Sequence, residues 1–386
     1  MLELTVENIG ALKNVRWAIP EGVSVLVGPN GSGKSTLLRM LAVLRAALAQ
    51  TLPVAADHYF GGARGFRHVG AAETEQSRIE LQVGDAQWWL RPTVQDASVS
   101  AQPEEEVRLS GKTVLRREAG AAQATFGGAP LVCGGKLALA ATVDYARTLG
   151  VEALSDSQRQ VVAMLASTYF YQLYASYDFN LSNLLRGGSQ HGSDQILHAS
   201  GQNVFTVLRN WSLKRDSRPQ YQFVIGALGT AFPDFEDFDF EQAGTTVTVT
   251  VHHRGAKTFS ILQESTGFVC ALLHLTAVAS ASAGTVVGID EIENSLHPEA
   301  IRSLLASIRR FAAERRLYVL LATHSPVVLD EFRDDPERVF VMEPGRAVLP
   351  VPVSELFDRD WLSQFSLGGL YAGKDFGAPV RPNAAE

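Results

Sequence analysis

The sequence predicts an α/β fold with a mainly parallel core sheet, an antiparallel β subdomain and a helical insertion. Apolar runs at residues 23–27, 285–289 and 317–322 have the length of strands, and segments of helical character alternate with them. Strands that are apolar throughout are buried on both faces, as in a parallel sheet covered by helices on both sides. Between the two ends of the chain, short hairpin-like runs indicate the antiparallel β subdomain, and a mainly helical stretch indicates the helical insertion.

The N-terminal part is expected to place three strands before one helix. These are residues 2–6, 15–18 and 23–27, followed by a helix at 36–48. Glycine recurs in residues 51–70, and this segment is expected to be irregular. From residue 78 to residue 143, short runs bounded by Gly, Asp or Pro are typical of antiparallel hairpins.

The second half is expected to be helical first and then alternating. Residues 143–231 are mainly helical, and GGSQHGSD at 187–194 is expected to be a flexible loop. TTVTVTV at 245–251 is a strand, and the apolar stretch 268–284 is a buried helix that contains His274. Pro298 opens the helix at 298–311, because proline is tolerated at a first helical turn.

These elements divide the chain into four expected segments. The first and third together form the core: the first carries the hairpins, and the third carries the second half of the core sheet. The second is the helical insertion, and the fourth is a C-terminal extension that is partly disordered, with residues 373–386 frayed. Their bounds are 1–142, 143–244, 245–350 and 351–386.

Composition excludes several classes of protein. The chain has 386 residues, 46% of them hydrophobic, which is ordinary for a globular protein with a sizeable core. A formal charge of −7 argues against a generally basic nucleic-acid coat, although a local basic groove remains compatible with it. Cys133 and Cys270 are too few for a disulfide framework or a zinc site, and they fit a reducing cytoplasm. The N-terminus lacks the apolar core of a signal peptide, and no stretch is long enough to span a membrane.

The strongest motif is GPNGSGKST at residues 28–36, which fits the phosphate-binding pattern G-x-x-x-x-G-K-[ST] between a strand and a helix. Its glycines let backbone N–H groups turn toward phosphates, and the helix N-terminus favours the same anions. Lys34 adds a full positive charge, and the Ser35 hydroxyl is placed to bind Mg²⁺. The residues expected to bind a nucleoside triphosphate are Gly28, Asn30, Gly31, Ser32, Gly33, Lys34, Ser35 and Thr36.

Two further strands end in residues that suit the same site. The strand at 285–289 is followed by Asp290, which can hold Mg²⁺, and by Glu291, which can act as a general base on the attacking water. The strand at 317–322 is followed by His324, which can hydrogen-bond the γ-phosphate. Alone, each of these is also compatible with a solvated strand end or a structural histidine. Together with the phosphate loop they predict Lys34, Glu291 and His324 as catalytic and Ser35 and Asp290 as metal ligands.

GPNGSGKST, GIDEIENSLHP and ATHSP together resemble the ATP-binding-cassette class of ATPases. Within that class they are similar to the stand-alone ATPases akin to RecF, SMC heads and the OLD proteins. The resemblance covers about residues 1–50 and 258–345, and the tail FSLGGLYAGKDFG at 365–377 is similar to the ending of one subgroup. It implies an ATPase head with a RecA-like core sheet, with ATP and Mg²⁺ as cofactors.

The resemblance also implies a signature at ESTGF, residues 264–268. Ser265, Thr266 and Gly267 would contact the γ-phosphate bound on the other subunit of a homodimer or higher homo-oligomer. The alternative is an ordinary serine cap of a helix. The sequence is far from the LSGGQ form of transporters, which argues against transport. The first turn has Ile9-Gly10 where many relatives carry an aromatic-basic pair, and Gln76 and Gln82 are the candidates for a glutamine loop.

Three functions follow from the resemblance and the residues. The first is an ATPase that regulates a separately encoded effector, a nuclease or TOPRIM-like protein in bacterial anti-phage defence, with residues 143–231 as the docking surface. The second is a RecF-like DNA repair ATPase that binds nucleic acid through arginine clusters, such as Arg64/Arg67, Arg116-Arg117 and Arg209/Lys214/Arg215/Arg218. The third is a nucleotide-gated scaffold with negligible turnover. The helical middle lacks the sustained heptads of a long SMC arm.

Overall fold

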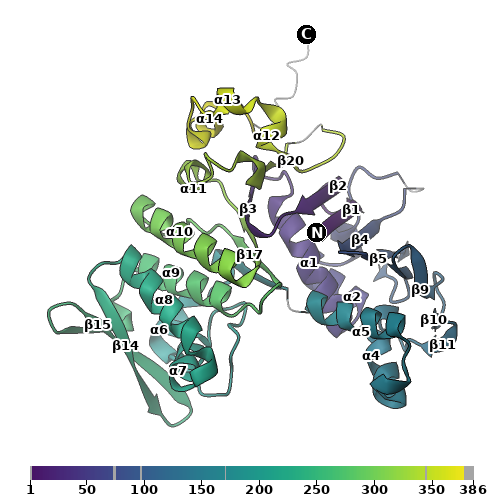
Figure 1. Ribbon diagram of the computed structural model, residues 1–386, viewed down its shortest axis with the longest axis horizontal. Coiled ribbons are helices and arrows are strands. Elements are labelled where there is room, and N and C mark those ends of the chain that lie inside the picture. Colours follow the sequence, from purple (N-terminus) through teal and green to yellow (C-terminus); the bar gives the residue numbers. More distant parts are fainter. Residues whose placement is uncertain (1, 73–74, 96–97, 170, 344–345, 378–386) are drawn as a thin grey trace.

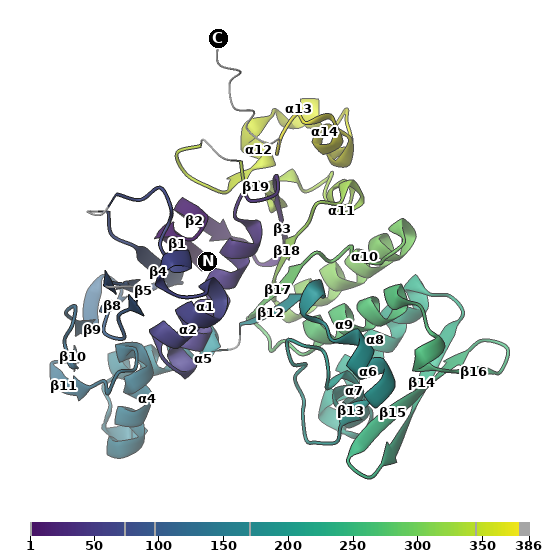
Figure 2. The same ribbon diagram turned by 180° about the vertical axis from the view of Figure 1, so that it is seen from behind.

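The computed structural model describes residues 2–72, 75–95, 98–169, 171–343 and 346–377. It confirms the predicted α/β class, with a parallel core sheet and an antiparallel subdomain. Two lobes flank the core sheet, one built from the N-terminal part of the chain and the other from its second half (Figures 1 and 2). The C-terminal helices lie together at one end of the molecule (Figure 1).

The core sheet has six strands, and its first five are parallel. The last strand pairs antiparallel with its neighbour. In spatial order they are β12 (Gln172–Ala175), β17 (Val286–Asp290), β18 (Tyr318–Ala322), β3 (Gly22–Val27), β19 (Val339–Val341) and β20 (Val351–Pro352). Alternate residues of each strand enter different cores: Val25 packs with the second-half lobe and Leu26 with the N-terminal lobe, which explains why the strands are apolar throughout.

The N-terminal lobe contains an eight-stranded antiparallel sheet, so the predicted hairpins are confirmed. In spatial order its strands are β11 (Ala129–Val132), β10 (Gln123–Phe126), β9 (Lys112–Arg117), β8 (Glu104–Leu109), β5 (Ala86–Arg91), β4 (Arg78–Val83), β1 (Leu2–Ile9) and β2 (Leu12–Ile19). A separate small ribbon joins β6 (Val94–Gln95) to β7 (Ser98–Val99).

Helices of the N-terminal lobe cover the core sheet and close the hairpin sheet. They are α1 (Lys34–Ala49), α2 (Leu52–Phe60), α3 (Ala63–Phe66), α4 (Ala138–Leu149) and α5 (Asp156–Tyr169). The expectation that residues 51–70 are irregular is wrong, because α2 and α3 occupy most of this segment. Pro53 lies in the first turn of α2. Gly61 follows the last residue of α2 in a left-handed conformation and caps the helix, so these residues mark helix ends rather than an irregular loop.

The second-half lobe packs five helices beside a small antiparallel sheet. The helices are α6 (Leu181–Gly187), α7 (Val204–Leu213), α8 (Arg218–Ala231), α9 (Thr266–Ala279) and α10 (Pro298–Arg315). The strands are β13 (Ser189–Gln190), β14 (Phe235–Ala243), β15 (Thr246–His253) and β16 (Lys257–Ser260). Every residue of α9 from Gly267 onward is buried, so this apolar stretch is a core helix as expected.

Residues 143–244 are mainly helical, but they are not only an insertion. They also contain β12, which pairs with β17 and completes one edge of the core sheet. The strand is only four residues long, and Gln172 and Leu173 are half-buried at that edge. A short, mixed edge strand of this kind has too weak a pattern to be distinguished from its helical surroundings.

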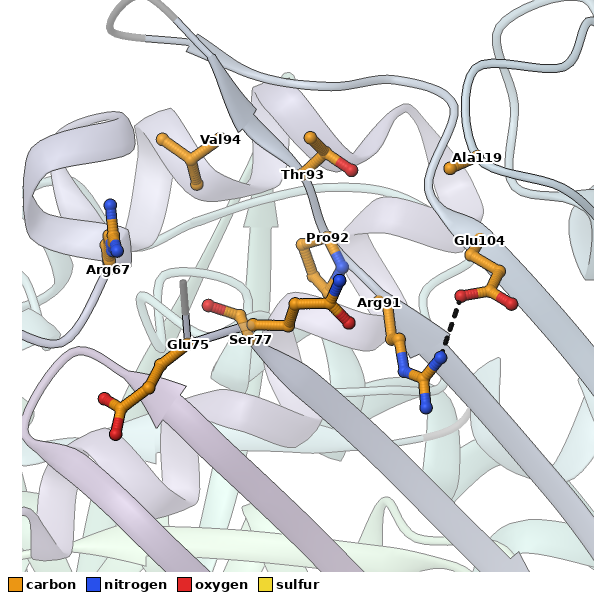
Figure 3. A pocket seen from close by; sticks show the side chains of 10 residues that line it. Arg67, Glu75, Ser77, Arg91, Pro92, Thr93, Val94, Glu104 and Ala119 are labelled. Atoms are coloured by element: carbon orange, nitrogen blue, oxygen red, sulfur yellow. Dashed lines mark hydrogen bonds and ion pairs between the residues drawn. The ribbon is translucent and has the colours of Figure 1, made fainter. Parts of the chain in front are cut away.

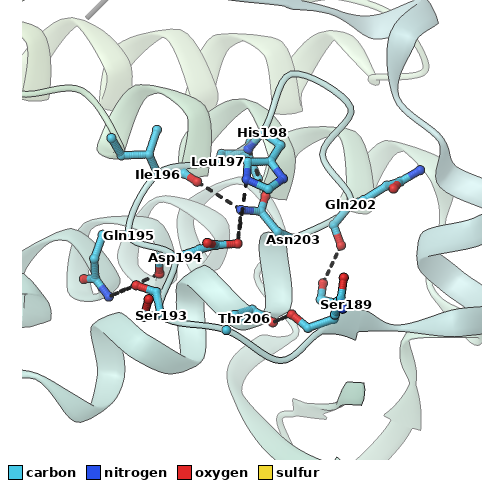
Figure 4. A network of polar contacts seen from close by, with 12 residues as sticks. Ser189, Ser193, Asp194, Gln195, Ile196, Leu197, His198, Gln202, Asn203 and Thr206 are labelled. Atoms are coloured by element: carbon cyan, nitrogen blue, oxygen red, sulfur yellow. Dashed lines mark hydrogen bonds and ion pairs between the residues drawn. The ribbon is translucent and has the colours of Figure 1, made fainter. Parts of the chain in front are cut away.

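The segment 187–203 is tied down by polar side chains, although residues 187–194 were expected to be a flexible loop. Asn203, which is 4% exposed, donates to Asp194 and to the carbonyl of Ile196 and accepts from the backbone of His198 (Figure 4). Ser189 donates to the carbonyl of Gln202, so both ends of the segment are joined (Figure 4).

The C-terminal extension is largely ordered within the described residues. It contains α12 (Val353–Leu356), α13 (Arg359–Leu362) and α14 (Leu367–Gly373), and α14 packs on α11 (Pro326–Asp330). Phe376 is 1% exposed, so the frayed tail expected from residue 373 does not begin there, while residues 378–386 lie outside the described residues. None of the helices in the described ranges combines the length and apolar character that crossing a membrane needs.

Candidate functional site

Three neighbouring parallel strands bring the predicted motifs together at one edge of the core sheet. In the register of the sheet, Leu26 of β3 pairs with Ala322 of β18, which pairs with Asp290 of β17. The loops that follow these strands therefore emerge side by side. This is the edge at which open α/β sheets place their ligands.

The phosphate loop has the close packing that its glycines require. A side-chain carbon on Gly28 would lie 2.3 Å from the carbonyl oxygen of Met342, so that position admits only glycine. Gly33 has a φ of 99°, a left-handed conformation directly before α1. Of the remaining loop residues, Asn30 and Gly31 are exposed and Ser32 is buried. Ser35 and Thr36 are half-buried in the first turn of α1.

Lys34 is buried and folded back onto the loop. Its Nζ donates to the carbonyl oxygens of Gly28 at 2.8 Å and Pro29 at 3.0 Å, and the residue is 5% exposed. Burial lowers the pKa of Lys34 to about 8, although the carboxylates of Asp290 and Glu293 act in the opposite direction. The ammonium therefore lies in a cradle of acceptors that a phosphate group could replace.

Asp290 is the last residue of β17 and Glu291 follows it, and the two residues have different environments. Asp290 is 4% exposed, and Glu291 has a φ of 59°, an uncommon left-handed conformation for a non-glycine residue. Two hydrogen bonds hold the backbone of Glu291: its N–H donates to Ala322 at 2.9 Å, and its carbonyl accepts from the Ser176 hydroxyl at 2.8 Å. Backbone strain of this kind concentrates at functional sites, because the surrounding contacts must maintain it.

His324 lies in a half-buried position between two polar groups. Its backbone N–H donates to Glu293 Oε1 at 2.9 Å, and its Nδ1 lies 3.2 Å from the hydroxyl of Tyr371. Burial and the neighbouring charge of Lys34 lower the pKa of His324. The imidazole is thus favoured in its neutral form.

Glu293, Tyr371 and Ser176 are site residues that sequence reasoning did not select. Glu293 lies inside the quoted segment GIDEIENSLHP and Tyr371 inside the quoted tail, so both had a signal that was not assigned to a residue. Ser176 follows β12, the strand that the sequence did not reveal, and carried no signal of its own.

The predicted signature begins α9 on the second-half lobe, away from α1 (Figures 1 and 2). Ser265 and Thr266 are exposed, and the Ser265 hydroxyl accepts from the N–H of Phe268 at 3.1 Å as the cap of α9. A side-chain carbon on Gly267 would lie 2.5 Å from the carbonyl of Ser295, in the loop after β17. The N-terminal end of α9 therefore exposes the hydroxyl side chains of Ser265 and Thr266 to solvent, while Gly267 packs tightly against the loop after β17.

The glutamine candidates lie in different settings. Gln76 lines a cavity of about 170 Å³ together with Arg67, Ser77 and Arg91, and Arg91 pairs there with Glu104 (Figure 3). Gln82 lies on β4 and donates to the carbonyl of Gly84, within its own hairpin.

The first turn has basic neighbours from another part of the chain. The carbonyl of Gly10 lies 2.8 Å from His68 Nδ1, and Ile9 forms a bridge with Arg67. The turn also lies against the phosphate loop, since a side-chain carbon on Gly10 would lie 3.1 Å from Thr36. The turn therefore contacts the segment after α3, which carries Arg67 and His68.

The arginine clusters differ in their availability. Arg117 has a fully buried side chain paired with Glu105, so it is not available to bind nucleic acid, and Arg116 pairs with Glu106 and Glu118. By contrast, the cluster at α7 and α8 is largely exposed, and only Arg209 is half-buried. Its members are Arg209, Lys214, Arg215 and Arg218.

Comparison with protein families gives one match. The model described as "AAA domain, putative AbiEii toxin, Type IV TA system" matches residues 23–83 and 144–330. These ranges include the phosphate loop, the predicted signature and the ends of β17 and β18. No match was found among the curated proteins.

One solved SMC head shares the fold, and two other SMC heads align with the chain at lower TM-scores. The SMC head bound to the C-winged helix domain of ScpA is 10% identical, with 92% of this chain and 99% of that chain covered and a TM-score of 0.51. The SMC head domain from Thermotoga maritima is 11% identical, with 88% and 93% covered and a TM-score of 0.43. The head with an extended coiled coil bound to the C-terminal domain of ScpA, derived from Pyrococcus furiosus, is 10% identical, with 92% and 98% covered and a TM-score of 0.47.

Proposed function

The chain belongs to the AAA domain family whose description names the AbiEii toxin of a type IV TA system, and we propose that it hydrolyses ATP as a dimer and regulates a separate effector. The observation that carries this proposal is the convergence of three strand ends. They bring Lys34, the Asp290-Glu291 pair and His324 to one edge of the core sheet.

Each residue of the edge has a proposed role. The loop from Gly28 to Thr36 binds the phosphates of ATP, with Lys34 on the β- and γ-phosphates. Ser35 and Asp290 hold Mg²⁺, whose charge would stabilise the reacting phosphates. Glu291 activates the attacking water as a general base. His324 senses the γ-phosphate.

The site is proposed to be completed by a second copy of the chain. Ser265, Thr266 and Gly267 begin α9 on the opposite lobe from α1, and the first two are exposed to solvent. A two-fold dimer would place this end of α9 against the phosphate loop of the partner and enclose two nucleotides. ATP would then hold the dimer closed, and hydrolysis would release it.

The effector is proposed to bind the mainly helical segment 143–231, which begins in the N-terminal lobe at α4 and continues into the second-half lobe through α6, α7 and α8. The family description points to a toxin system, and the similar SMC head was solved with a domain of ScpA, which supports a protein partner on such a head. A nuclease or TOPRIM-like protein of bacterial anti-phage defence is the proposed effector. The effector and this proposed docking region, residues 143–231, would form a cytoplasmic assembly.

Direct binding of duplex DNA is the second candidate, and one observation favours it. A largely exposed basic cluster lies where α7 leads into α8; its members are Arg209, Lys214, Arg215 and Arg218. Neutralising Lys214, Arg215 and Arg218 together would then weaken ATP-dependent DNA binding, and binding by the unchanged chain would fall steeply with salt. A nucleotide-gated scaffold without turnover is the third candidate, and a hydrolysis assay separates it from the first two.

The central test is Glu291→Gln. This variant should still bind ATP and form a dimer, because the amide retains size and polarity, while the rate of hydrolysis should fall on the order of 100-fold without the general base. Phosphate release measures the rate of hydrolysis, and light scattering measures the formation of the dimer. Glu299→Gln is the matched control, since Glu299 is an exposed carboxylate on α10. Normal hydrolysis by Glu291→Gln would remove Glu291 from its role.

A further inference from the structure

The C-terminal segment returns to the phosphate loop. Phe376 is buried, and a side-chain carbon on Gly377 would lie 3.5 Å from the Cα of Gly28. Between α14 and this contact, the chain turns at Lys374, which has a left-handed conformation. Residues at the far end of the sequence therefore form a wall of the candidate nucleotide site.

The C-terminal segment packs on α11, the helix that follows His324. Gly368 packs so closely on α11 that a side-chain carbon there would lie 2.3 Å from the carbonyl of Pro326, and its N–H donates to Asp330 at 2.7 Å. The aromatic ring of Tyr371 also packs near Phe376, with centroids 5.9 Å apart. The position of Tyr371 is thus set from both sides.

The Tyr371 hydroxyl has one proton and two neighbours that can accept it, the carbonyl oxygen of Gly28 and, in the tautomer protonated at Nε2, the Nδ1 of His324. It lies 3.2 Å from His324 Nδ1 and 3.5 Å from the carbonyl oxygen of Gly28, which is at the limit of a hydrogen bond. That carbonyl already accepts from Lys34 Nζ at 2.8 Å. Because the contact with Nδ1 is the shorter of the two, the proton of Tyr371 is directed to Nδ1.

Control of the tautomer matters because His324 is neutral. A neutral imidazole has one N–H, and the hydrogen bond at one ring nitrogen decides which form is present. Burial and the positive charge of Lys34 lower the pKa of His324 and disfavour the imidazolium, and burial raises the pKa of Tyr371, so the phenol keeps its proton. Accepting at Nδ1 leaves Nε2 as the nitrogen that carries the proton.

We propose that Tyr371 is a positioning residue, which donates its hydroxyl to Nδ1 of His324 and so holds the ring in the form protonated at Nε2. In that form Nε2–H can donate to the γ-phosphate, whereas the other tautomer presents a lone pair that the anion repels. This inference rests on the proposed function, in which His324 faces ATP.

The first test removes only the hydroxyl. Tyr371→Phe should lower kcat for ATP on the order of ten-fold, with a smaller change in KM, because the lost hydrogen bond acts through the tautomer rather than on binding. In a His324→Ala background the same substitution should have almost no further effect. Tyr318→Phe is the matched control, because Tyr318 lies at the opposite end of β18, the strand that leads to His324.

The second test does not depend on activity. In protein labelled with ¹⁵N-histidine, the ring nitrogens of His324, assigned by their loss in His324→Ala, should show the proton at Nε2 in the free chain, and Tyr371→Phe should raise the share at Nδ1. A proton at Nδ1 in the unchanged protein would overturn the inference, as would equal losses of kcat with and without His324. A chain that lacks ATPase activity but shows the Nε2–H form would contradict the proposed function and leave this assignment standing.

Discussion

The ammonium of Lys34 is held in the free protein by two backbone carbonyls and is shielded from water, so its charge is easier to lose than that of an exposed lysine. Its pKa is lowered to about 8, with burial as the largest cause. A bound phosphate would raise it, because the anion favours the charged form. The affinity for ATP is thus linked to the protonation of this one group.

The linkage gives a pH dependence with a definite sign. At pH 7 and below Lys34 is largely protonated and its contribution to ATP binding should not vary with pH, whereas from pH 7 to about 10 binding should take up as much as one proton and the affinity should fall. Calorimetry of ATP binding in buffers of different ionisation enthalpy measures the uptake, and titrations at pH 7 are the control. An affinity that stays constant from pH 7 to pH 9.5 would contradict this linkage.

A second residue-scale prediction concerns the buried ion pair of Glu105 and Arg117. Both side chains are fully buried, and Glu105 also accepts from Trp88 and from the first N–H groups of α4. Glu105→Gln should lower the free energy of unfolding by about 3–5 kcal/mol, because it leaves the guanidinium charged and uncompensated. Urea denaturation measures the change. Glu104→Gln on the same strand should cost less than about 1 kcal/mol, since its ion pair with Arg91 is partly solvated.

At the scale of single residues, the sequence alone predicted those site residues that belong to a local sequence motif. Lys34, Asp290, Glu291 and His324 could be selected because each follows a strand in a recognisable motif. Tyr371 reaches His324 across 47 positions of sequence, and Arg117 pairs with Glu105 across two hairpin strands. Such pairs depend on tertiary packing, which no local pattern encodes. Hence Arg117 was grouped with possible nucleic-acid contacts.

At the scale of elements, the loop between α6 and α7 shows how polar side chains can replace a core. Asn203 alone makes three of its hydrogen bonds (Figure 4). Asn210 of α7 donates to the carbonyls of Gly192 and Asp194. The composition of residues 187–194 is that of a linker. The side chains that hold residues 187–194 lie mainly on residues that follow them in the sequence.

Asn203→Ala should therefore loosen this element. Removing a buried amide that joins three partners should lower the free energy of unfolding by about 1–3 kcal/mol and speed amide hydrogen exchange in residues 189–203. Gln202→Ala is the matched control, because Gln202 is exposed and contributes through its backbone carbonyl. Equal exchange in the two variants would show that the amide does not hold the loop.

Strand and helix prediction succeeded where an element was long and apolar. The strands of the core at β3, β17 and β18 and the buried α9 could be found because their patterns leave no alternative. Short elements were lost: β12 has four residues at a sheet edge, and α2 has a proline in its first turn and a glycine directly after its last residue. Gly and Pro mark helix ends as well as loops, so their density alone misidentified the segment.

At the scale of the whole molecule, the proposed site is divided between the two lobes. Lys34 begins α1 in the N-terminal lobe, while Ser265 begins α9 in the second-half lobe (Figure 1). Because Ser265 and Thr266 are exposed, they are available to a second copy of the chain. If two chains join head to head, every complete site contains Lys34 of one subunit and Ser265 of the other.

A mixing experiment tests this division. Lys34→Ala removes the phosphate-binding charge, and Ser265→Arg places a bulky side chain at the exposed cap of α9; each variant alone should lose ATPase activity. Random pairing of the two variants forms heterodimers with one intact site, built from the unchanged Lys34 of one subunit and the unchanged Ser265 of the other. The mixture should therefore regain part of the activity in a phosphate-release assay, while mixing Lys34→Ala with Glu291→Gln should regain none, because both changes damage the same half of the site. Activity that does not rise above that of the separate variants would show that Ser265 serves only its own helix.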